Sequence, residues 1–261
     1  MIMKKEFPIL EYDHNSKAVI MPHDVHKPVE HDGCAVICFF WEVLRDFQAA
    51  GRLEVVASEP TECGPMHTYA LMHKGVRLLI RHPGIGAPFA VCTLEALIAM
   101  GSRKIIACGG AGVLKKEIAS GHLIVPDCAV RDEGTSYHYL PAAREIAINQ
   151  AALRAITTTL DNHHSPYLVG KTWTTDGVYR ETPAKVRHRR AEGCITVEME
   201  CAAFAAAAQF RGVTFGQILY GGDDVSSELW DSRDWENNIT AHATVREKLF
   251  WLAVEAVLAI A

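Results

Sequence analysis

Short apolar runs alternate with helical patterns along the chain, and glycines separate many of them. Aliphatic runs between glycine, proline or polar clusters predict strands, whereas apolar residues on one helical face predict helices. The predicted strands are 17–21, 53–57, 68–73, 76–81, 104–108, 122–125, 167–173, 195–197 and 213–220. The predicted helices are 34–50, 90–100, 145–160, 183–191, 200–210 and 245–260. The strands 68–73 and 76–81 meet at Lys74-Gly75, which predicts a hairpin.

Strands that alternate with helices, and that are apolar on both faces, are typical of a mostly parallel sheet between two helical layers. The sequence contains no internal repeat and no Ser/Gly/Pro-rich linker. We therefore expect residues 1–261 to form a single three-layer α/β/α domain with a mixed, mostly parallel central sheet. In such sheets a ligand lies outside the carboxyl ends of the strands.

The charge balance argues against several classes of partner. There are 31 acidic and 26 basic residues in 261, a net charge of −5, so electrostatic binding to nucleic acid has little support. The basic run at 185–190 is typical of a solvated helix face. The apolar tract at 249–261 is too short to span a membrane, and residues 1–12 lack the apolar region of a secretory signal. We expect a cytoplasmic protein that binds neither nucleic acid nor membranes.

The eight cysteines are too dilute for a disulfide scaffold, and most lie in apolar surroundings, as buried thiols do in a reducing compartment. Cys34 and Cys38 are one helical turn apart, but no second cysteine pair or histidine pair stands at zinc-ligand spacing. We expect neither a metal nor an organic cofactor.

Two glycine-rich turns follow predicted strands, namely Gly84-Ile85-Gly86 and the segment 109–112. Small residues let backbone N–H groups approach an anion or a sugar closely. Neither turn matches the dinucleotide-binding fingerprint or the P-loop. A tight turn between packed elements is the alternative interpretation of each.

Val197-Glu198-Met199-Glu200 places two carboxylates at the end of a predicted strand, directly before a very apolar helix. A carboxylate near a helix N-terminus interacts favourably with the helix dipole, so capping is one interpretation. Two carboxylates in an apolar stretch need partners, because an unpaired buried charge is costly. The vicinal hydroxyls of a ribose would provide such partners.

Gly221-Gly222-Asp223-Asp224 ends another predicted strand. Either aspartate can cap the following segment with Ser226, or one of them can act as a general acid. A polar and aromatic loop at 130–139 is too rich in hydrogen-bonding groups to be a simple connection.

These motifs together resemble the nucleoside phosphorylase family, which contains hexameric purine nucleoside phosphorylases, uridine phosphorylases and related hydrolytic nucleosidases. The resemblance rests on the Val197–Glu200 string, the Pro83–Pro88 turn, the glycine turn at 109–112 and the loop 131–139. It extends from about Val19 to the C-terminus. It implies a nucleoside phosphorylase-like fold and cleavage of a nucleoside N-glycosidic bond, by phosphate in phosphorylases and by water in nucleosidases.

The resemblance also implies roles for particular residues. Glu198, Met199 and Glu200 would line the ribose site, with Glu200 as the partner of the sugar hydroxyls. Asp223 is spaced from Glu200 like the aspartate with which purine-cleaving members protonate the departing base. Glu200 and Asp223 are therefore the implied catalytic residues, and Val178, Arg180 and Asp223 the implied base-binding residues. This pattern favours a purine over a pyrimidine, and the glutamine and arginine that read uracil are not evident.

The phosphate site departs from the family's pattern. The family's first strand ends in Pro-Gly-Asp-Pro with an arginine close behind, where this chain has Pro22-His23-Asp24-Val25-His26-Lys27. A second arginine is replaced by Ala107, and the Thr or Ser of the glycine turn by Gly110. The resemblance leaves Lys27, Gly84 and Gly110 as phosphate-binding residues, with Arg81, Arg180 or a neighbouring subunit's arginine as substitutes.

Three functions are consistent with these residues. The first is phosphorolysis to free base and ribose 1-phosphate, a pentosyltransferase reaction with phosphate as co-substrate. The second is hydrolysis by water, which the missing arginines favour, and the third is a non-catalytic nucleoside-binding relative. Because the family builds its active sites at subunit contacts, we expect a homo-oligomer, either a dimer or a hexamer made of dimers.

Overall fold

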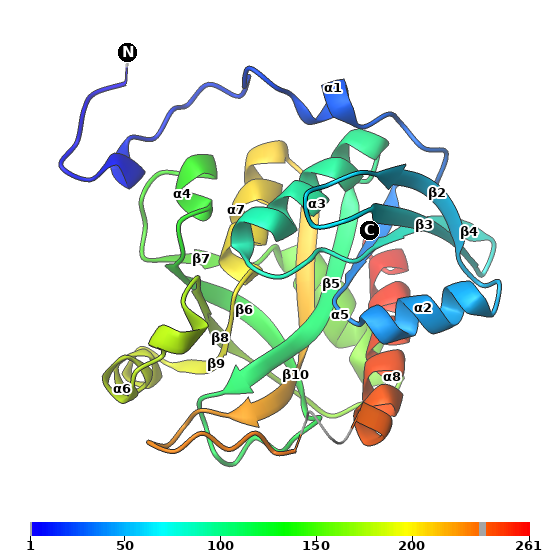
Figure 1. Ribbon diagram of the computed structural model, residues 1–261. Helices are drawn as coiled ribbons and strands as arrows, with labels where there is room; N and C mark the ends of the chain where they lie inside the picture. The colour runs from blue at the N-terminus through cyan, green and yellow to red at the C-terminus, as the bar shows by residue number, and fades with distance from the viewer. Residues whose placement is uncertain (1, 235–238) are drawn as a thin grey trace.

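The computed structural model describes residues 2–234 and 239–261, in which helices cover a ten-stranded sheet (Figure 1). The strands are β1 (Cys34–Cys38), β2 (Glu54–Glu59), β3 (Met66–His73), β4 (Val76–Arg81), β5 (Lys104–Val113), β6 (Leu123–Asp132), β7 (Glu145–Ala147), β8 (Tyr167–Thr175), β9 (Cys194–Glu198) and β10 (Thr214–Asp224). The helices are α1 (Pro22–Val25), α2 (Trp41–Ala49), α3 (Ala87–Met100), α4 (Ser136–Tyr139), α5 (Gln150–Asn162), α6 (Pro183–Ala191), α7 (Cys201–Arg211) and α8 (Ile239–Leu258).

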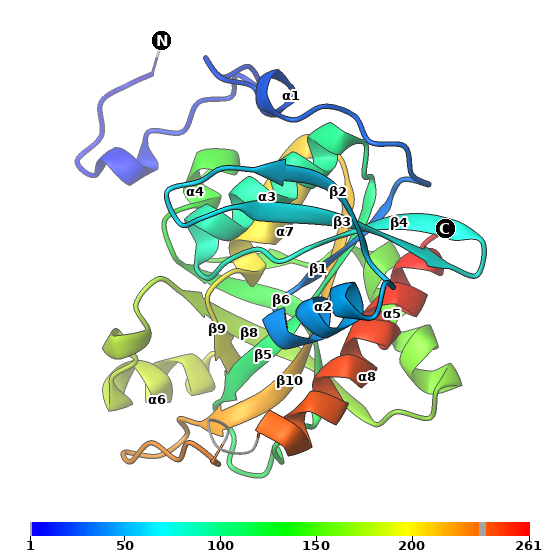
Figure 2. The ribbon, with the colours of Figure 1, turned by 45° about the vertical axis from the view of Figure 1, so that its right-hand side comes forward.

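The sheet is mixed and partly closed on itself. Its strand order is β10-β6-β8-β9-β5-β1-β4-β3-β2, with β7 paired to β6. Strand β10 pairs with β6 and also with β5, so β5, β9, β8, β6 and β10 form a ring (Figure 2). The two longest ladders, β5–β10 and β6–β8, are parallel. The mixed α/β fold predicted from the alternation of elements is confirmed, whereas the closure by β10 was not predicted.

Helices cover both faces of the sheet and bury two main apolar clusters. On one face α3 and α7 pack through residues such as Leu94 and Phe204. On the other face α2, α5 and α8 pack through residues such as Leu44, Ile156 and Phe250. This arrangement is the predicted three-layer architecture, and Figure 2 shows the sheet between the two groups of helices.

Two of the predicted helices begin as strands. Residues 34–50 were predicted as one helix, but they form β1 and then α2. All five side chains of β1 are buried, and its backbone pairs with β4 on one side and β5 on the other. Likewise, the predicted helix 145–160 begins as β7, because Asn149 caps α5 with its side chain and so fixes the start of the helix.

The N-terminal segment 2–33 carries no strand, so the strand predicted at 17–21 is wrong. Val19 and Ile20 are 102% and 71% exposed, and no described strand pairs with them. An apolar run without a neighbouring strand leaves its backbone groups in water instead of in a ladder. In Figure 1 this segment runs along the edge of the molecule near α4, α7 and α3.

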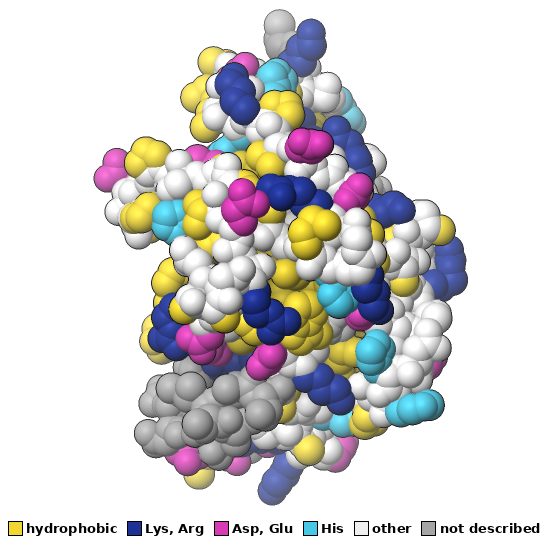
Figure 3. Space-filling model, turned by 90° about the vertical axis from the view of Figure 1, so that its right-hand side faces the viewer, with side chains coloured by type: hydrophobic (Ala, Val, Ile, Leu, Met, Phe, Trp, Pro, Cys, Tyr) yellow, Lys and Arg dark blue, Asp and Glu magenta, His cyan; other side chains and the backbone are white. Residues whose placement is uncertain are grey.

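The surface carries charges of both signs. Figure 3 shows basic and acidic side chains interspersed on one face of the molecule. Within residues 2–234 and 239–261, no helix combines the length and apolar character needed to cross a membrane. The same residues contain no group of three or more His, Cys, Asp or Glu arranged to hold a metal ion.

Candidate active site

A cavity of about 280 Å³ lies where the last residues of β5, β9 and β10 meet. Its volume is close to the lower end of the roughly 300–1,000 Å³ typical of small-molecule sites. Its lining comes from several elements: Phe39, Ile85, Gly110, Ala111, Gly112, Val178, Glu181, Val197, Glu198, Met199, Glu200, Tyr220, Gly222, Asp223 and Arg246. The ladders hold these strand ends in place, because Gly112 pairs with Val197 and Gly110 with Tyr220. The cavity therefore unites the predicted motifs of three separate chain segments.

Glu198 holds the start of α7. It is 7% exposed, and its carboxylate accepts the backbone N–H of Glu200 at 2.8 Å and of Cys201 at 2.6 Å. The Thr174 hydroxyl donates to the same carboxylate at 2.6 Å. Burial raises the pKa of Glu198 to about 7, and these hydrogen bonds limit the rise. Glu198 lines the cavity, as predicted, but its oxygens bind protein groups in the way that the capping interpretation describes.

Glu200 lies just beyond the strand, at the N-cap of α7, and faces the glycine turn that precedes α3. It is 6% exposed, and it accepts the Gly86 N–H at 2.6 Å and the Met199 N–H at 3.3 Å. Burial, followed by repulsion from Glu198, raises its pKa to about 8. Gly86 has φ +90°, a left-handed conformation that glycine adopts without strain. The two motifs, 84–86 and 197–200, therefore form one site.

Three further side chains lie along the cavity: Val178, Glu181 and Asp223. Burial, and then the charge of Asp223, raises the pKa of Glu181 to about 7. The sequence motifs assign no role to Glu181, which lines the cavity, whereas Arg180 is exposed and does not line it.

The two adjacent aspartates have separate tasks. Asp223 accepts the Trp230 indole N–H at 2.7 Å and faces the cavity. Asp224 points away, accepts the backbone N–H of Ser226 at 2.8 Å and pairs with Arg233 at 3.2 Å. The predicted capping contact to Ser226 is therefore made by Asp224, which leaves Asp223 for the cavity. No sequence signal identified Trp230.

Two of the predicted phosphate-binding residues do not line the cavity. Lys27 is exposed, and two residues later the Val29 N–H donates to Met100 at the C-terminal end of α3. Because α3 has 14 residues, its C-terminal end lies about 20 Å from its N-terminal end. At the N-terminal end, the N–H of Gly86 donates to Glu200. Gly84 leaves room for Phe89, whose ring would lie 2.3 Å from a Cβ at this position. Its neighbour Ile85 lines the cavity instead.

Gly110, the third predicted phosphate-binding residue, does line the cavity. A Cβ at this position would lie 3.2 Å from the Tyr220 ring, so the glycine allows close packing there. Ala107 stands three residues before Gly110 on β5. It is fully buried and has no charged side chain that could face the site. The segment 109–112 is predicted as a turn, but it continues β5, because β10 pairs with residues 109–111 and β9 pairs with Gly112.

Arg246 of α8 was not predicted as a site residue, because nothing in the pattern of that helix separates it from surface cations. Its Nη1 donates to Glu42 Oε1 at 2.6 Å, and its Nε donates to the Tyr220 hydroxyl at 3.1 Å. Among the described residues that line the cavity, Arg246 is the only Lys or Arg. Four lining residues carry carboxyl groups: Glu181, Glu198, Glu200 and Asp223.

The raised pKa of Glu200 predicts a stability that depends on pH. Between its ordinary value of 4.5 and about 8, the folded state holds a proton that the unfolded state has lost, so stability falls as pH rises through this window. Glu200→Gln removes this penalty. We expect calorimetry to show the variant gaining on the order of 5 °C in Tm over the wild type at pH 8 and much less at pH 5. An offset of the same size at both pH values would contradict the assignment.

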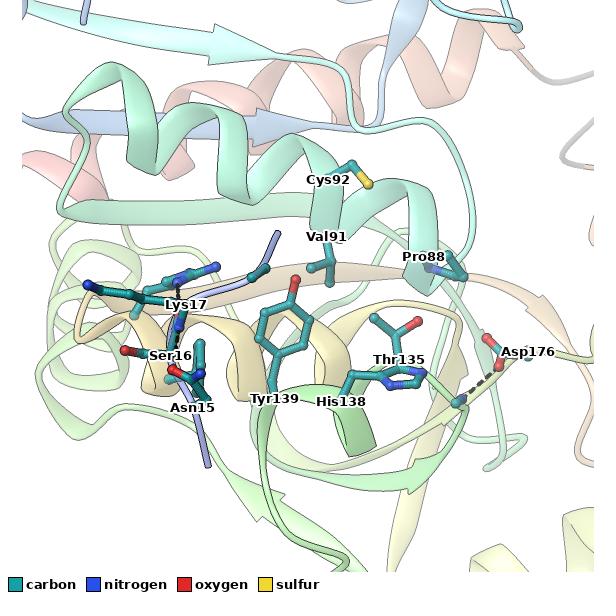
Figure 4. Close-up of a pocket in the computed structure, with 14 residues that line it drawn as sticks. Asn15, Ser16, Lys17, Pro88, Val91, Cys92, Thr135, His138, Tyr139 and Asp176 are labelled. Carbon is teal, nitrogen blue, oxygen red and sulfur yellow. Dashed lines mark hydrogen bonds between the residues drawn. The ribbon is translucent and has the colours of Figure 1, made fainter. Parts of the chain in front are cut away.

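A larger hollow of about 550 Å³ lies elsewhere, between the N-terminal segment and the helices α3, α4 and α7. In Figure 4, Tyr139 lies between Val91 and the N-terminal residues Asn15–Lys17. Arg211 lines this hollow and pairs with Glu95 at 2.8 Å. None of the predicted catalytic, ribose-binding, phosphate-binding or base-binding residues lines it, so volume alone does not identify the functional site.

The chain belongs to the phosphorylase superfamily, whose family model matches residues 34–258. It is 27% identical over 146 residues to guanosine phosphorylase of Halorubrum lacusprofundi, covering 56% of this chain and 61% of the relative. It is 32% identical over 116 residues to uridine phosphorylase of Thermococcus kodakarensis, covering 43% of this chain and 40% of the relative. The matches thus span about three fifths and two fifths of these relatives. Family membership confirms the resemblance seen in the motifs.

Solved structures share the fold. Uridine phosphorylase from Vibrio fischeri ES114 superposes with a TM-score of 0.70 at 23% identity, covering 92% of this chain and 94% of that one. AMP nucleosidase from Bacteroides thetaiotaomicron superposes with a TM-score of 0.69 at 24% identity, covering 88% and 89%. The same architecture is therefore present in a protein named as a phosphorylase and in one named as a nucleosidase.

Proposed function

We propose that this protein cleaves the N-glycosidic bond of a nucleoside with a purine base. The observation that carries the proposal is that one cavity holds both Glu200 and Asp223, from the two motifs that the resemblance singles out. A buried carboxylate and a second acid in one cavity fit a reaction in which a sugar gains positive charge while its leaving group gains a proton.

Glu200 is the proposed partner of the sugar. Its ionised form can accept hydrogen bonds from ribose hydroxyls and stabilise an oxocarbenium-like transition state in a dry pocket. Contact with those hydroxyls favours the charged carboxylate and opposes the burial that raises its pKa. Met199 lines the same part of the cavity and gives the sugar an apolar contact.

Asp223 is the proposed proton donor to the departing base. A purine leaves poorly as an anion, so a proton delivered to it contributes about 10²–10⁴ in rate. Trp230 donates to the Asp223 carboxylate at 2.7 Å and fixes its position. Val178 and Glu181 complete the proposed base site, and Glu181 can exchange hydrogen bonds with base nitrogens in either protonation state.

Either phosphate or water can attack the anomeric carbon. The names of the relatives favour phosphate, whereas the residues of the cavity favour water. Phosphorolysis to ribose 1-phosphate is supported by the phosphorylase names of the sequence relatives. Hydrolysis is supported by the shortage of unpaired positive charge in the cavity, where Arg246, the only Lys or Arg among the described lining residues, is paired with Glu42. The ionised Glu200 that the proposed sugar contact requires also repels a phosphate dianion, because two unit charges about 8 Å apart interact by roughly 2 kcal/mol at an effective dielectric constant of about 20. We propose water as the nucleophile.

One panel separates these functions. The purified protein is incubated with inosine, adenosine, guanosine and uridine, with and without phosphate, and products are separated by chromatography. We expect purine release that is indifferent to phosphate, with free ribose as the second product. Ribose 1-phosphate and a phosphate-dependent rate would establish phosphorolysis instead. Thermal stabilisation by nucleosides without any base release would support a binding protein and overturn the enzymatic proposal.

We also propose that the chain forms a homo-oligomer. Val19, Ile20 and Val25 of the N-terminal segment are all more than half exposed, and contact with a second copy would cover such side chains. Light scattering coupled to size-exclusion chromatography measures this state.

A further inference from the structure

The residues at one end of the cavity bear on the choice of nucleophile. Arg246 reaches this end from α8, and Glu42, which does not line the cavity, pairs with it from the first turn of α2. Their side chains are 14% and 23% exposed, and their closest nitrogen and oxygen lie 2.6 Å apart. This half-buried pair is a feature of tertiary packing, since 204 positions separate the two residues.

The pair is connected to the cavity wall through an aromatic side chain. Arg246 Nε donates to the Tyr220 hydroxyl at 3.1 Å, and the guanidinium carbon lies 5.8 Å from the centre of the Tyr220 ring. The Tyr220 ring also lies against Gly110 of β5, and because glycine has no side chain, the ring packs directly on the β5 backbone. The guanidinium is thereby fixed at the part of the cavity wall formed by Gly110 and Tyr220.

The charge of Arg246 is already balanced within the protein. Burial opposes its ionisation, but the contacts with Glu42 and Tyr220 together outweigh burial and leave the pKa of Arg246 above its ordinary value. The guanidinium therefore stays charged and paired with a carboxylate. An anion that approaches Arg246 must compete with Glu42, whereas a water molecule needs only a hydrogen bond.

We propose that the ion pair between Glu42 and Arg246 determines the nucleophile of the reaction, by neutralising the one described cation of the cavity and so admitting water in preference to phosphate. Glu42 acts through Arg246, so it is a positioning residue and not a catalytic one. The inference rests on the proposed glycosidic cleavage. In the favoured reaction the bond from the anomeric carbon to the base nitrogen breaks, and a bond to the water oxygen forms. The base takes a proton from Asp223. The water molecule loses a proton as it attacks, and this proton returns to the Asp223 carboxylate.

The test is to free Arg246 without removing it. Glu42→Gln keeps the shape and an oxygen that can accept from Nη1, but removes the negative charge. Base release is measured for the nucleoside that the wild type cleaves fastest, with saturating phosphate or with chloride at equal ionic strength. We expect no phosphate effect in the wild type. In Glu42→Gln we expect about a tenfold acceleration by phosphate, with ribose 1-phosphate as a product.

Two controls isolate the charge of Glu42. Asp46→Asn changes an exposed carboxylate one turn further along α2, and we expect it to respond to phosphate like the wild type. The double variant Glu42→Gln/Arg246→Gln should lose the response that the single variant gains. Calorimetric titration of the wild type with inorganic phosphate should detect no binding, and this measurement stands even if Glu42→Gln does not fold.

The outcomes distinguish the inference from the function beneath it. A wild type that binds phosphate or needs it for base release overturns the inference but leaves glycosidic cleavage intact. A folded Glu42→Gln protein that forms no ribose 1-phosphate also overturns the inference. The absence of base release from every nucleoside in the wild type overturns the proposed function itself.

Discussion

Replacing Glu200 with glutamine should lower kcat for base release by about 10²–10³-fold. The variant keeps an oxygen to accept the Gly86 N–H, which Glu200 binds at 2.6 Å, so the turn before α3 stays in place. It loses the negative charge that stabilises the sugar as positive charge develops. Steady-state kinetics on the preferred nucleoside measure the loss, which should appear mainly in kcat and less in KM.

Glu62→Gln provides the matched control for this variant. Glu62 is exposed and lies outside the cavity, so the same chemical change there should leave kcat unaltered. If Glu200→Gln turned over at nearly the rate of the wild type, the carboxylate would have no part in the transition state.

Asp223→Asn should reduce purine release by about 10²–10⁴-fold, because asparagine cannot deliver a proton to the departing base. The effect should depend on the leaving group. A riboside of p-nitrophenol, whose anion departs without protonation, should lose far less of its rate than a purine nucleoside. Parallel kinetics on the two substrates measure this difference.

The same pair of substrates separates proton donation from positioning. An equal loss on both substrates would mean that Asp223 supports the site structurally and donates no proton. Trp230→Phe removes the 2.7 Å hydrogen bond but keeps the acid, so it tests the contribution of this orientation separately. We expect its loss to be smaller than that of Asp223→Asn.

The alternation of apolar runs and helical patterns was enough to predict the class of fold. Such patterns report burial on each element, and most elements of this sheet are buried on both faces. Residues 34–50 were misassigned because Cys34–Cys38 is fully apolar, and periodicity cannot distinguish a fully buried strand from a buried helix. The neighbours β4 and β5 decide the matter, and they come later in the chain.

The candidate site was partly predictable for a similar reason. Glu200 and Asp223 stand in local motifs at strand ends, where sequence patterns are informative. The separate task of Glu198 follows from two backbone N–H groups at the start of α7, which no spacing rule specifies. The assignment of Lys27 to the phosphate site depends on a first strand at 17–21. Because the first strand is β1, which begins at Cys34, the residues after 17–21 do not lie at a strand end and Lys27 does not line the cavity.

Arg246 and Trp230 had no local signal at all. Arg246 reaches the cavity only through packing of distant segments, as its contact with Glu42 illustrates. Trp230 contacts Asp223 from seven positions along the chain, where the segment after β10 folds back and Asp231 bridges to Asp224. Sequence patterns of a single chain describe regular elements, whereas the contacts of Arg246 depend on how α2, α8 and β10 come together in space.

The proposed reacting groups lie on the closed ring of strands, whereas part of the proposed base site lies outside it. Asp223 lies on β10 where its pairing with β5 shifts register, and Glu198 ends β9 paired with Thr174 of β8. Val178, by contrast, belongs to the short 3-10 turn Val178–Arg180 outside the ring and is 48% exposed. We expect substitutions in this turn to alter which base the proposed enzyme accepts while its cleavage chemistry stays intact. Such an arrangement would let substrate preference diverge among descendants without a new catalytic centre.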